Sequence, residues 1–138
     1  MSAYATHSTT FTEAAYLVAA LRAAKFTVEV HEQAQTLYDY HGRPRPQKAS
    51  IIIRRQHTGI AASNDIGFYR ESDGTYKAII SEYDRGAKFS DRWLNSLKQS
   101  YQEQRQMAIA KQRGYHFAGR EEIQTATGKE VKLRFTIR

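Results

Sequence analysis

The strict alternation of the last eight residues constrains the fold of this chain most. In residues 131–138 the apolar side chains of Val131, Leu133, Phe135 and Ile137 alternate with polar side chains, most of them Lys or Arg. Successive side chains of a β-strand point to opposite sides, so the pattern predicts a strand with one core face and one basic face. The chain therefore contains a sheet, and part of its positive charge lies on that sheet.

Length and composition limit the class of protein. We expect a single domain over residues 1–138, because a chain of this length can bury a hydrophobic core without disulfide cross-links. The sequence has no cysteine, which excludes disulfides, thiolate zinc sites and a cysteine nucleophile. This usage suits a reducing compartment, and we expect a cytoplasmic protein. No apolar run approaches the ~20 residues of a membrane span, and the polar residues 1–10 lack a signal-peptide core.

Hydrophobic periodicity predicts an alternation of strands and helices. Ala14, Leu17, Val18 and Leu21 recur at helical spacing, and Asp-Gly at residues 73–74 is typical of a hairpin turn. We expect strands at 3–10, 26–31, 50–57, 65–69 and 75–83. A first helix follows a capping box of Thr10 and Glu13 and ends near Lys25, and a long helix is capped by Ser90 or Asp91 and stopped by Gly114. A closing hairpin consists of residues 116–125, a turn at 127–128 and the final strand 131–138. Residues 32–49, which contain both prolines, are predicted to form a long loop or exposed ribbon.

This element order predicts an α+β fold. We expect a ferredoxin-like two-layer sandwich, in which two helices pack on one face of an antiparallel sheet with extra hairpin strands. Trp93 lies beside the start of the long helix, where we expect it to plug the core and hold that helix against the sheet. The alternative for Trp93 is an exposed ligand platform.

The basic residues form the first candidate site. Residues 40–64 contain no Asp or Glu, and the formal net charge of the chain is +7. If the strand at 50–57 and the last strand share a sheet, one face could dock on an acidic protein or on the phosphates of single-stranded nucleic acid. Exposed tyrosines such as Tyr69 or Tyr83 could then stack on bases. The alternative is a solvated edge whose charge prevents aggregation. The candidate residues are Arg43, Arg45, Arg54, Arg55, Lys132, Arg134 and Arg138.

Carboxylates around the predicted 65–83 hairpin form the second candidate site. Strand pairing could bring Asp65 close to Glu82 and Asp84, as a divalent cation or an acid/base pair would require. The alternative is that these side chains are solvated turn and helix-start residues. The five histidines lack metal-ligand spacing, and no nucleophile elbow, Walker loop or dinucleotide-binding motif is present.

Three segments together resemble a known family. They are Asn64-Asp65-Ile66-Gly67-Phe68, Ile79-Ile80-Ser81-Glu82-Tyr83-Asp84, and the stretch from Trp93 to Tyr101. The chain is similar to the uncharacterised domain-of-unknown-function family that includes a conserved open reading frame of red-algal plastids and cyanobacteria, in its bacterial branch. The resemblance implies a small soluble accessory protein without an established activity, cofactor or catalytic residue. In some genomes the family gene neighbours an AAA-type ATPase, which implies a protein partner of that kind.

From these observations we expect a non-enzymatic binding or adaptor protein that acts with a protein partner and has no cofactor. The first alternative is a module that binds single-stranded nucleic acid through the basic sheet face. The second alternative is a divalent-metal-dependent hydrolase that uses Asp65, Glu82 and Asp84.

Overall fold

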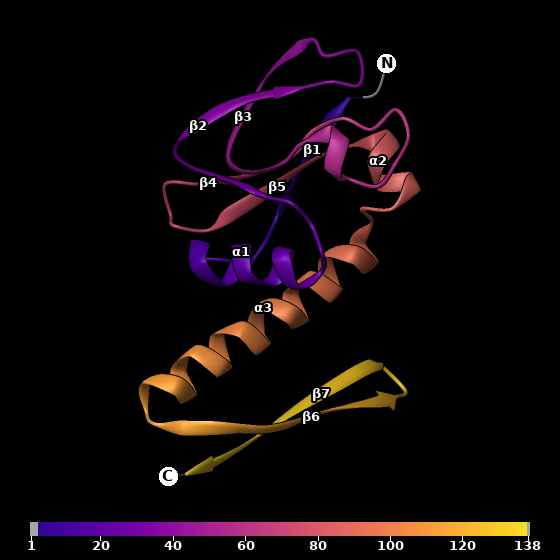
Figure 1. Cartoon of the computed structure of the whole chain (residues 1–138). Coiled ribbons are helices and arrows are strands. Elements are labelled where there is room, and N and C mark those ends of the chain that lie inside the picture. The colour runs from indigo at the N-terminus through magenta and orange to yellow at the C-terminus, as the bar shows by residue number, and fades with distance from the viewer. Residues whose placement is uncertain (1–2, 138) are drawn as a thin grey trace.

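A computed structural model describes residues 3–137 of the chain, so Arg138 lies outside the described residues (Figure 1). The elements in chain order are β1 (Tyr4–Ser8), α1 (Ala14–Ala23), β2 (Glu29–Tyr38), β3 (Pro44–Ile53), the short 3-10 helix η1 (Arg55–His57), β4 (Ile66–Arg70), β5 (Tyr76–Ser81), α2 (Glu82–Ala87), α3 (Asp91–Gln112), β6 (Tyr115–Thr125) and β7 (Gly128–Ile137).

Two sheets make up the β structure. The larger sheet has the order β1-β5-β4-β3-β2, and every neighbouring pair in it is antiparallel. The connection through α1 leads from β1 at one edge to β2 at the opposite edge. The hairpin of β6 and β7 forms a second sheet of its own. The predicted α+β class is confirmed, whereas this strand order does not confirm the ferredoxin-like arrangement.

The main core lies between the helices and one face of the larger sheet. On β3 and β4, Ile51, Ile53 and Phe68 are almost completely buried. Leu17 from α1 and Tyr101 from α3 belong to the same cluster. Figure 1 shows α1 and the first half of α3 beneath this sheet. The helical periodicity that begins at Ala14 therefore located the face that α1 buries.

The opposite face of the sheet is covered by the hairpin of β2 and β3, and here one of the two sequence-based predictions was wrong. Residues 32–38 belong to β2 and residues 44–49 to β3, with a turn over 39–43, so this segment is a ribbon of paired strands and not a long loop. Between the pairs Val30–Ile51 and Gln35–Ala49, β2 has four residues (31–34) and β3 has one, Ser50. Such a bulge bends a strand pair sharply and interrupts the period-2 pattern, which is why alternation did not reveal these strands.

The bent half of this hairpin forms a second small core. Leu37 and Ala49 pack with Ile52 and Ile79 on the face turned away from the helices. Gly67 on β4 allows this approach, since a Cβ at residue 67 would lie 2.4 Å from the Cβ of Ala49. The sheet is therefore wrapped by its own hairpin, and its second face is not open over this region.

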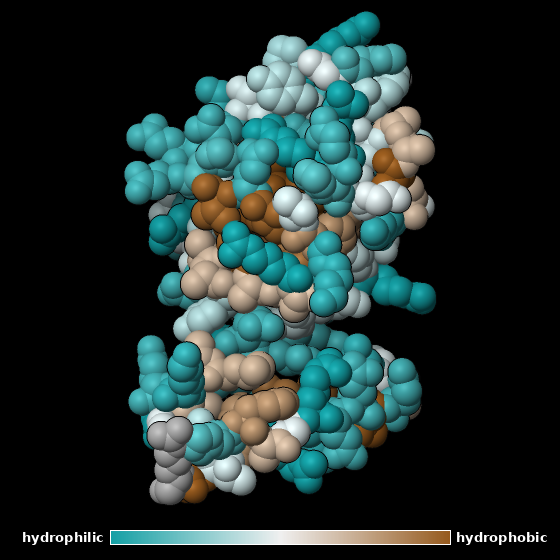
Figure 2. Space-filling view, viewed as in Figure 1, coloured by the Kyte–Doolittle hydropathy of each residue, from teal (hydrophilic) through white to brown (hydrophobic). Residues whose placement is uncertain are grey.

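The C-terminal half of α3 extends away from the larger sheet, and the hairpin of β6 and β7 lies along this helix (Figure 1). We call residues 103–112 of α3 together with β6 and β7 the hairpin lobe. No described residue from 111 to 137 is fully buried. Figure 2 shows apolar surface on this lobe, enclosed by hydrophilic side chains. A two-stranded sheet of this kind is marginal on its own and depends on its packing against α3.

Candidate functional site

Asp65 is the centre of a buried polar network at the end of β3. Its Oδ1 accepts a hydrogen bond from the backbone N–H of Arg55 at 2.8 Å. Its Oδ2 accepts from the Nη1 of Arg54 and from the backbone N–H of Tyr38, both at 2.8 Å. The Tyr4 hydroxyl donates to the Asp65 carbonyl at 2.8 Å. Asp65 thus joins β1, β2 and the start of η1 to the start of β4, and these donors satisfy its buried charge.

Asp84 forms a second buried network at the start of α2. Ser81 is the N-cap of this helix, and its Oγ accepts from the Asp84 N–H and donates to the Asp84 carboxylate at 2.7 Å. Ser63 donates to Oδ1, while the backbone and side-chain N–H groups of Asn64 donate to Oδ2. Asn64 adjoins Asp65 in the chain, so the two networks meet at this pair of residues.

The three carboxylates proposed as a metal site differ in exposure and in hydrogen bonding. Glu82 is exposed on α2, whereas Asp65 and Asp84 are buried with their oxygens engaged by protein donors. Within residues 3–137, no group of three or more His, Cys, Asp or Glu side chains is arranged to hold a metal ion. Asp65 and Asp84 support the loop that joins η1 to β4, which is a structural role.

Arg54 connects the network to the edge strand β2. Its guanidinium makes a bidentate pair with Glu29 at 2.9 and 3.1 Å and also bonds the carbonyl of Thr36 at 3.0 Å. The hydrogen bonds from Arg54 hold the pKa of the Glu29 carboxyl below its usual range. Burial, and then the negative charge of Asp65, raises the pKa of the Tyr4 hydroxyl, which stays a neutral donor.

The predicted single basic face does not exist in the form that the sequence suggested. Its premise was that the strand containing Ile51–Ile53 and the last strand share a sheet, but β3 and β7 belong to different sheets. Arg54 and Arg55 point into the protein, where Arg55 donates to the carbonyl of Tyr40 at 3.1 Å. Alternation identified the last strand correctly, but its predicted core face is wrong, because no described residue of β7 is buried and Ile137 is 78% exposed. Alternation also contains no information about the pairing partner of a strand.

The remaining predicted basic residues lie at two distant places. Arg43 is exposed beside the β2–β3 turn, and the Arg45 guanidinium lies 5.6 Å from the centre of the Tyr4 ring. Lys132 and Arg134 are exposed on β7, in the hairpin lobe. The structure thus keeps Lys132 and Arg134 together and separates them from the residues at the β2–β3 hairpin.

The hairpin lobe contains a shallow groove that sequence reasoning did not identify. One wall is a face of α3 with helical spacing, and the other wall comes from both strands of the hairpin. Phe117 is 47% exposed and Met107 is 37% exposed at this groove. The signal in the sequence was the row of residues at i, i+3, i+4 and i+7 near the end of the long helix. The lining residues are Gln104, Met107, Ala108, Lys111, Tyr115, His116, Phe117 and Phe135.

Polar contacts hold the hairpin at a fixed distance from α3. The Arg120 guanidinium on β6 makes two hydrogen bonds to Glu103 on α3, at 2.8 and 3.0 Å. Its third contact is to Glu122 at 2.6 Å, and the hydrogen bonds to both carboxylates raise the pKa of Arg120. Gln99 donates to the carbonyl of Lys129 at 2.7 Å. The lobe is therefore clamped by charged groups, while the apolar groove beside them stays open.

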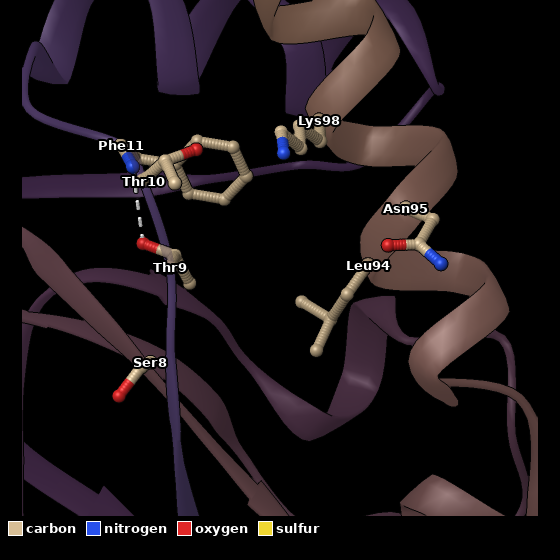
Figure 3. Close-up of a pocket in the computed structure, with 7 residues that line it drawn as sticks. All are labelled: Ser8, Thr9, Thr10, Phe11, Leu94, Asn95 and Lys98. Carbon is tan, nitrogen blue, oxygen red and sulfur yellow. Dashed lines mark hydrogen bonds between the residues drawn. The ribbon is translucent and has the colours of Figure 1, made fainter.

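A second hollow lies in the main body, between the β1–α1 connection and α3 (Figure 3). The Lys98 side chain extends toward Phe11 and Thr10, and Leu94 forms the opposite part of the wall. The Thr9 hydroxyl accepts from the Phe11 N–H at 3.2 Å and also contacts the carbonyl of Tyr76. The Thr9 hydroxyl therefore holds the β1–α1 connection against β5.

A comparison with protein families identifies the family of this chain. The model of the DUF1257 family, described as proteins of unknown function, matches residues 20–131. The chain therefore belongs to the DUF1257 family. No curated protein and no solved structure matches the chain. The matched range includes both buried networks and most of the hairpin lobe. Among the described residues, no helix has the length and apolar character to cross a membrane.

Proposed function

We propose that this protein is a non-enzymatic adaptor in the cytoplasm that binds a protein partner through its hairpin lobe. One observation carries the proposal: the lobe projects from the main body on α3 and leaves an apolar groove exposed. Tyr115, Phe117 and Met107 present more than a third of their surface there. Contiguous apolar surface with a polar rim is typical of protein interaction sites.

The internal networks support a binding function rather than catalysis. Asp65 and Asp84 are the most deeply buried carboxylates described here, and both are satisfied by donors of the protein itself. Their hydrogen bonds organise the loop before β4 and the cap of α2. An acid or base that serves a substrate needs an accessible oxygen in a cleft.

Affinity purification from native cells tests the proposal. We expect the tagged protein to recover one partner in a constant ratio and the double variant Met107→Ser/Phe117→Ser to lose it. The matched control is Val30→Ser/Tyr69→Ser, which changes residues of similar exposure on the larger sheet. This control should retain the partner. Recovery of the wild-type protein alone, or the same partners with the groove variant, would contradict the proposal.

Binding of single-stranded nucleic acid is the alternative, now reduced to Lys132 and Arg134 on β7. Neither side chain has a salt bridge within residues 3–137. If they neutralise phosphates, Lys132→Gln/Arg134→Gln should reduce the log–log salt slope of oligonucleotide binding by roughly 1–1.5 units. An unchanged slope, or no binding at low salt, would remove this alternative.

A further inference from the structure

The outer edge of β7 is an unpaired strand edge in the described part of the chain. The hairpin contains only β6 and β7, so each strand has a neighbour on one side. Gln99 donates to the Lys129 carbonyl, which must therefore face away from β6. Backbone groups of a strand alternate between its two edges, so those of Val131 and Leu133 face the same way. From Val131 onward, this edge can accept a further strand.

β7 is also the more regular strand of the hairpin. The register shift near the middle of the hairpin falls between Phe117 and Gly119, and it places the extra residue, Ala118, on β6. On β7, Arg134 and Phe135 pair without an interruption. A regular edge of this length is a suitable template for an extended segment, because it can form a continuous ladder of backbone hydrogen bonds.

The charges of β7 determine which segment fits. Lys132 and Arg134 lie on one face together with Glu130, and Glu121 of β6 pairs with Lys132, whereas Val131, Leu133 and Phe135 lie half-buried on the face toward α3. The two cations are adjacent positions of this face on β7, so they form its positive end. We propose that an extended acidic segment of the partner protein pairs with β7, with acidic side chains beside Lys132 and Arg134 and apolar side chains beside Leu133. This inference rests on the proposed function and adds the binding mode and the chemistry of the partner.

A second copy of this chain is the competing occupant of this edge. If two β7 strands paired antiparallel about Leu133, Lys132 of each copy would lie opposite Arg134 of the other, and directly opposed like charges destabilise a strand pair. A register centred on Val131 would instead place Glu130 of each copy opposite Lys132 of the other, and opposite charges stabilise a strand pair. Sedimentation velocity of the full chain decides between the two occupants. We expect a monomer, whereas a dimer that Lys132→Glu/Arg134→Glu abolishes would overturn the acidic segment as the occupant.

A synthetic peptide tests the binding mode directly. The probe is a fluorescent decapeptide of alternating Glu and Val, and its binding to the full chain is measured by anisotropy at low and high salt. We expect saturable binding that weakens as salt increases, since the charged contacts are exposed. Lys132→Glu/Arg134→Glu should lower the affinity about tenfold, because two attractive contacts become repulsive. A peptide with Lys in place of Glu should not bind.

Two controls separate this mode from general charge attraction. Arg43→Glu/Lys48→Glu makes the same change in net charge at the exposed β2–β3 hairpin, and it should leave the peptide affinity unchanged. A peptide with alternate backbone nitrogens methylated keeps its charges but cannot complete the ladder, and it should bind at least tenfold more weakly. Equal loss in both charge variants, or full binding of the methylated peptide, would overturn the inference.

The outcomes also distinguish this inference from the proposed function. If Lys132→Glu/Arg134→Glu still recovers the native partner while Met107→Ser/Phe117→Ser does not, the adaptor proposal stands and strand addition is wrong. If the peptide fails to bind and a single-stranded oligonucleotide binds instead, strand addition is wrong and the nucleic-acid alternative is supported.

Discussion

Replacing Gly67 with alanine should destabilise the protein, although glycine in a strand is normally the weaker choice. The new Cβ would lie 2.4 Å from the Cβ of Ala49 and 3.2 Å from both Cδ atoms of Leu37. Non-bonded carbons rest at about 3.5–4.0 Å, so the bent half of the β2–β3 hairpin must move by about 1 Å. Overpacking of this kind costs about 1–3 kcal/mol, which exceeds the roughly 0.5–1 kcal/mol that alanine otherwise contributes.

Urea unfolding followed by circular dichroism measures this effect. The matched control is Gly86→Ala on α2, where an added Cβ meets nothing within 4 Å. Because alanine favours the helix, this control should be neutral or more stable by up to about 1 kcal/mol. Gly67→Ala should shift the midpoint to lower urea with little change in slope.

The double variant Gly67→Ala/Ala49→Gly identifies the cause. Ala49→Gly alone should lose about 1.5 kcal/mol, through a buried methyl group and added chain entropy. Together the two changes remove the closest contact, so the double variant should be at least 1 kcal/mol more stable than the sum of the single effects predicts. Strict additivity, or a Gly67→Ala protein as stable as the wild type, would refute the reasoning.

Three further predictions concern the networks and the core. Asp84→Ala leaves several buried donors unsatisfied and should lower the free energy of unfolding by at least about 3 kcal/mol in urea titrations. The hydrogen bonds from Arg54 lower the pKa of Glu29, so this group contributes stability above its unfolded pKa that is lost as pH falls below about 4.5. Glu29→Gln should therefore lose less stability than the wild type between pH 7 and pH 3, and an equal loss would contradict the assignment. Trp93 is only half-buried, with its ring centre 4.6 Å from that of Phe89, so Trp93→Ala should cost about 2–3 kcal/mol in thermal or urea unfolding rather than the larger value of a fully buried ring.

Local patterns in the sequence predicted most elements because those elements bury one face each. The helical spacing that begins at Ala14 corresponds to α1, and the alternation that ends at Ile137 corresponds to β7. The helix α2 was missed because its six residues contain a glycine and too little apolar periodicity. Its capping residue Ser81 is nevertheless visible in the sequence, three residues before Asp84.

The candidate sites were harder to predict, because they depend on which strands pair. Arg54 and Lys132 both belong to strongly basic segments, yet one is an internal ion-pair partner and the other is exposed in a different sheet. Alternation assigns a face to each residue without stating what lies opposite that face. The carboxylates Asp65 and Asp84 were considered as a metal or acid/base site or as solvated turn residues, yet both are buried, and the donors that surround them come from four separate segments.

The strand order also determines when this fold can be completed during synthesis. From β2 to β5 the larger sheet follows the chain, so each strand can pair with its predecessor as it is translated. β1 is made first but pairs with β5, and the pair Tyr4–Ser81 joins residues 77 positions apart. A contact of such sequence separation closes slowly. The nascent chain therefore carries an unpaired β1 until residue 81 has emerged, and a change that prevents β1 from pairing would expose the edge of β5 to aggregation.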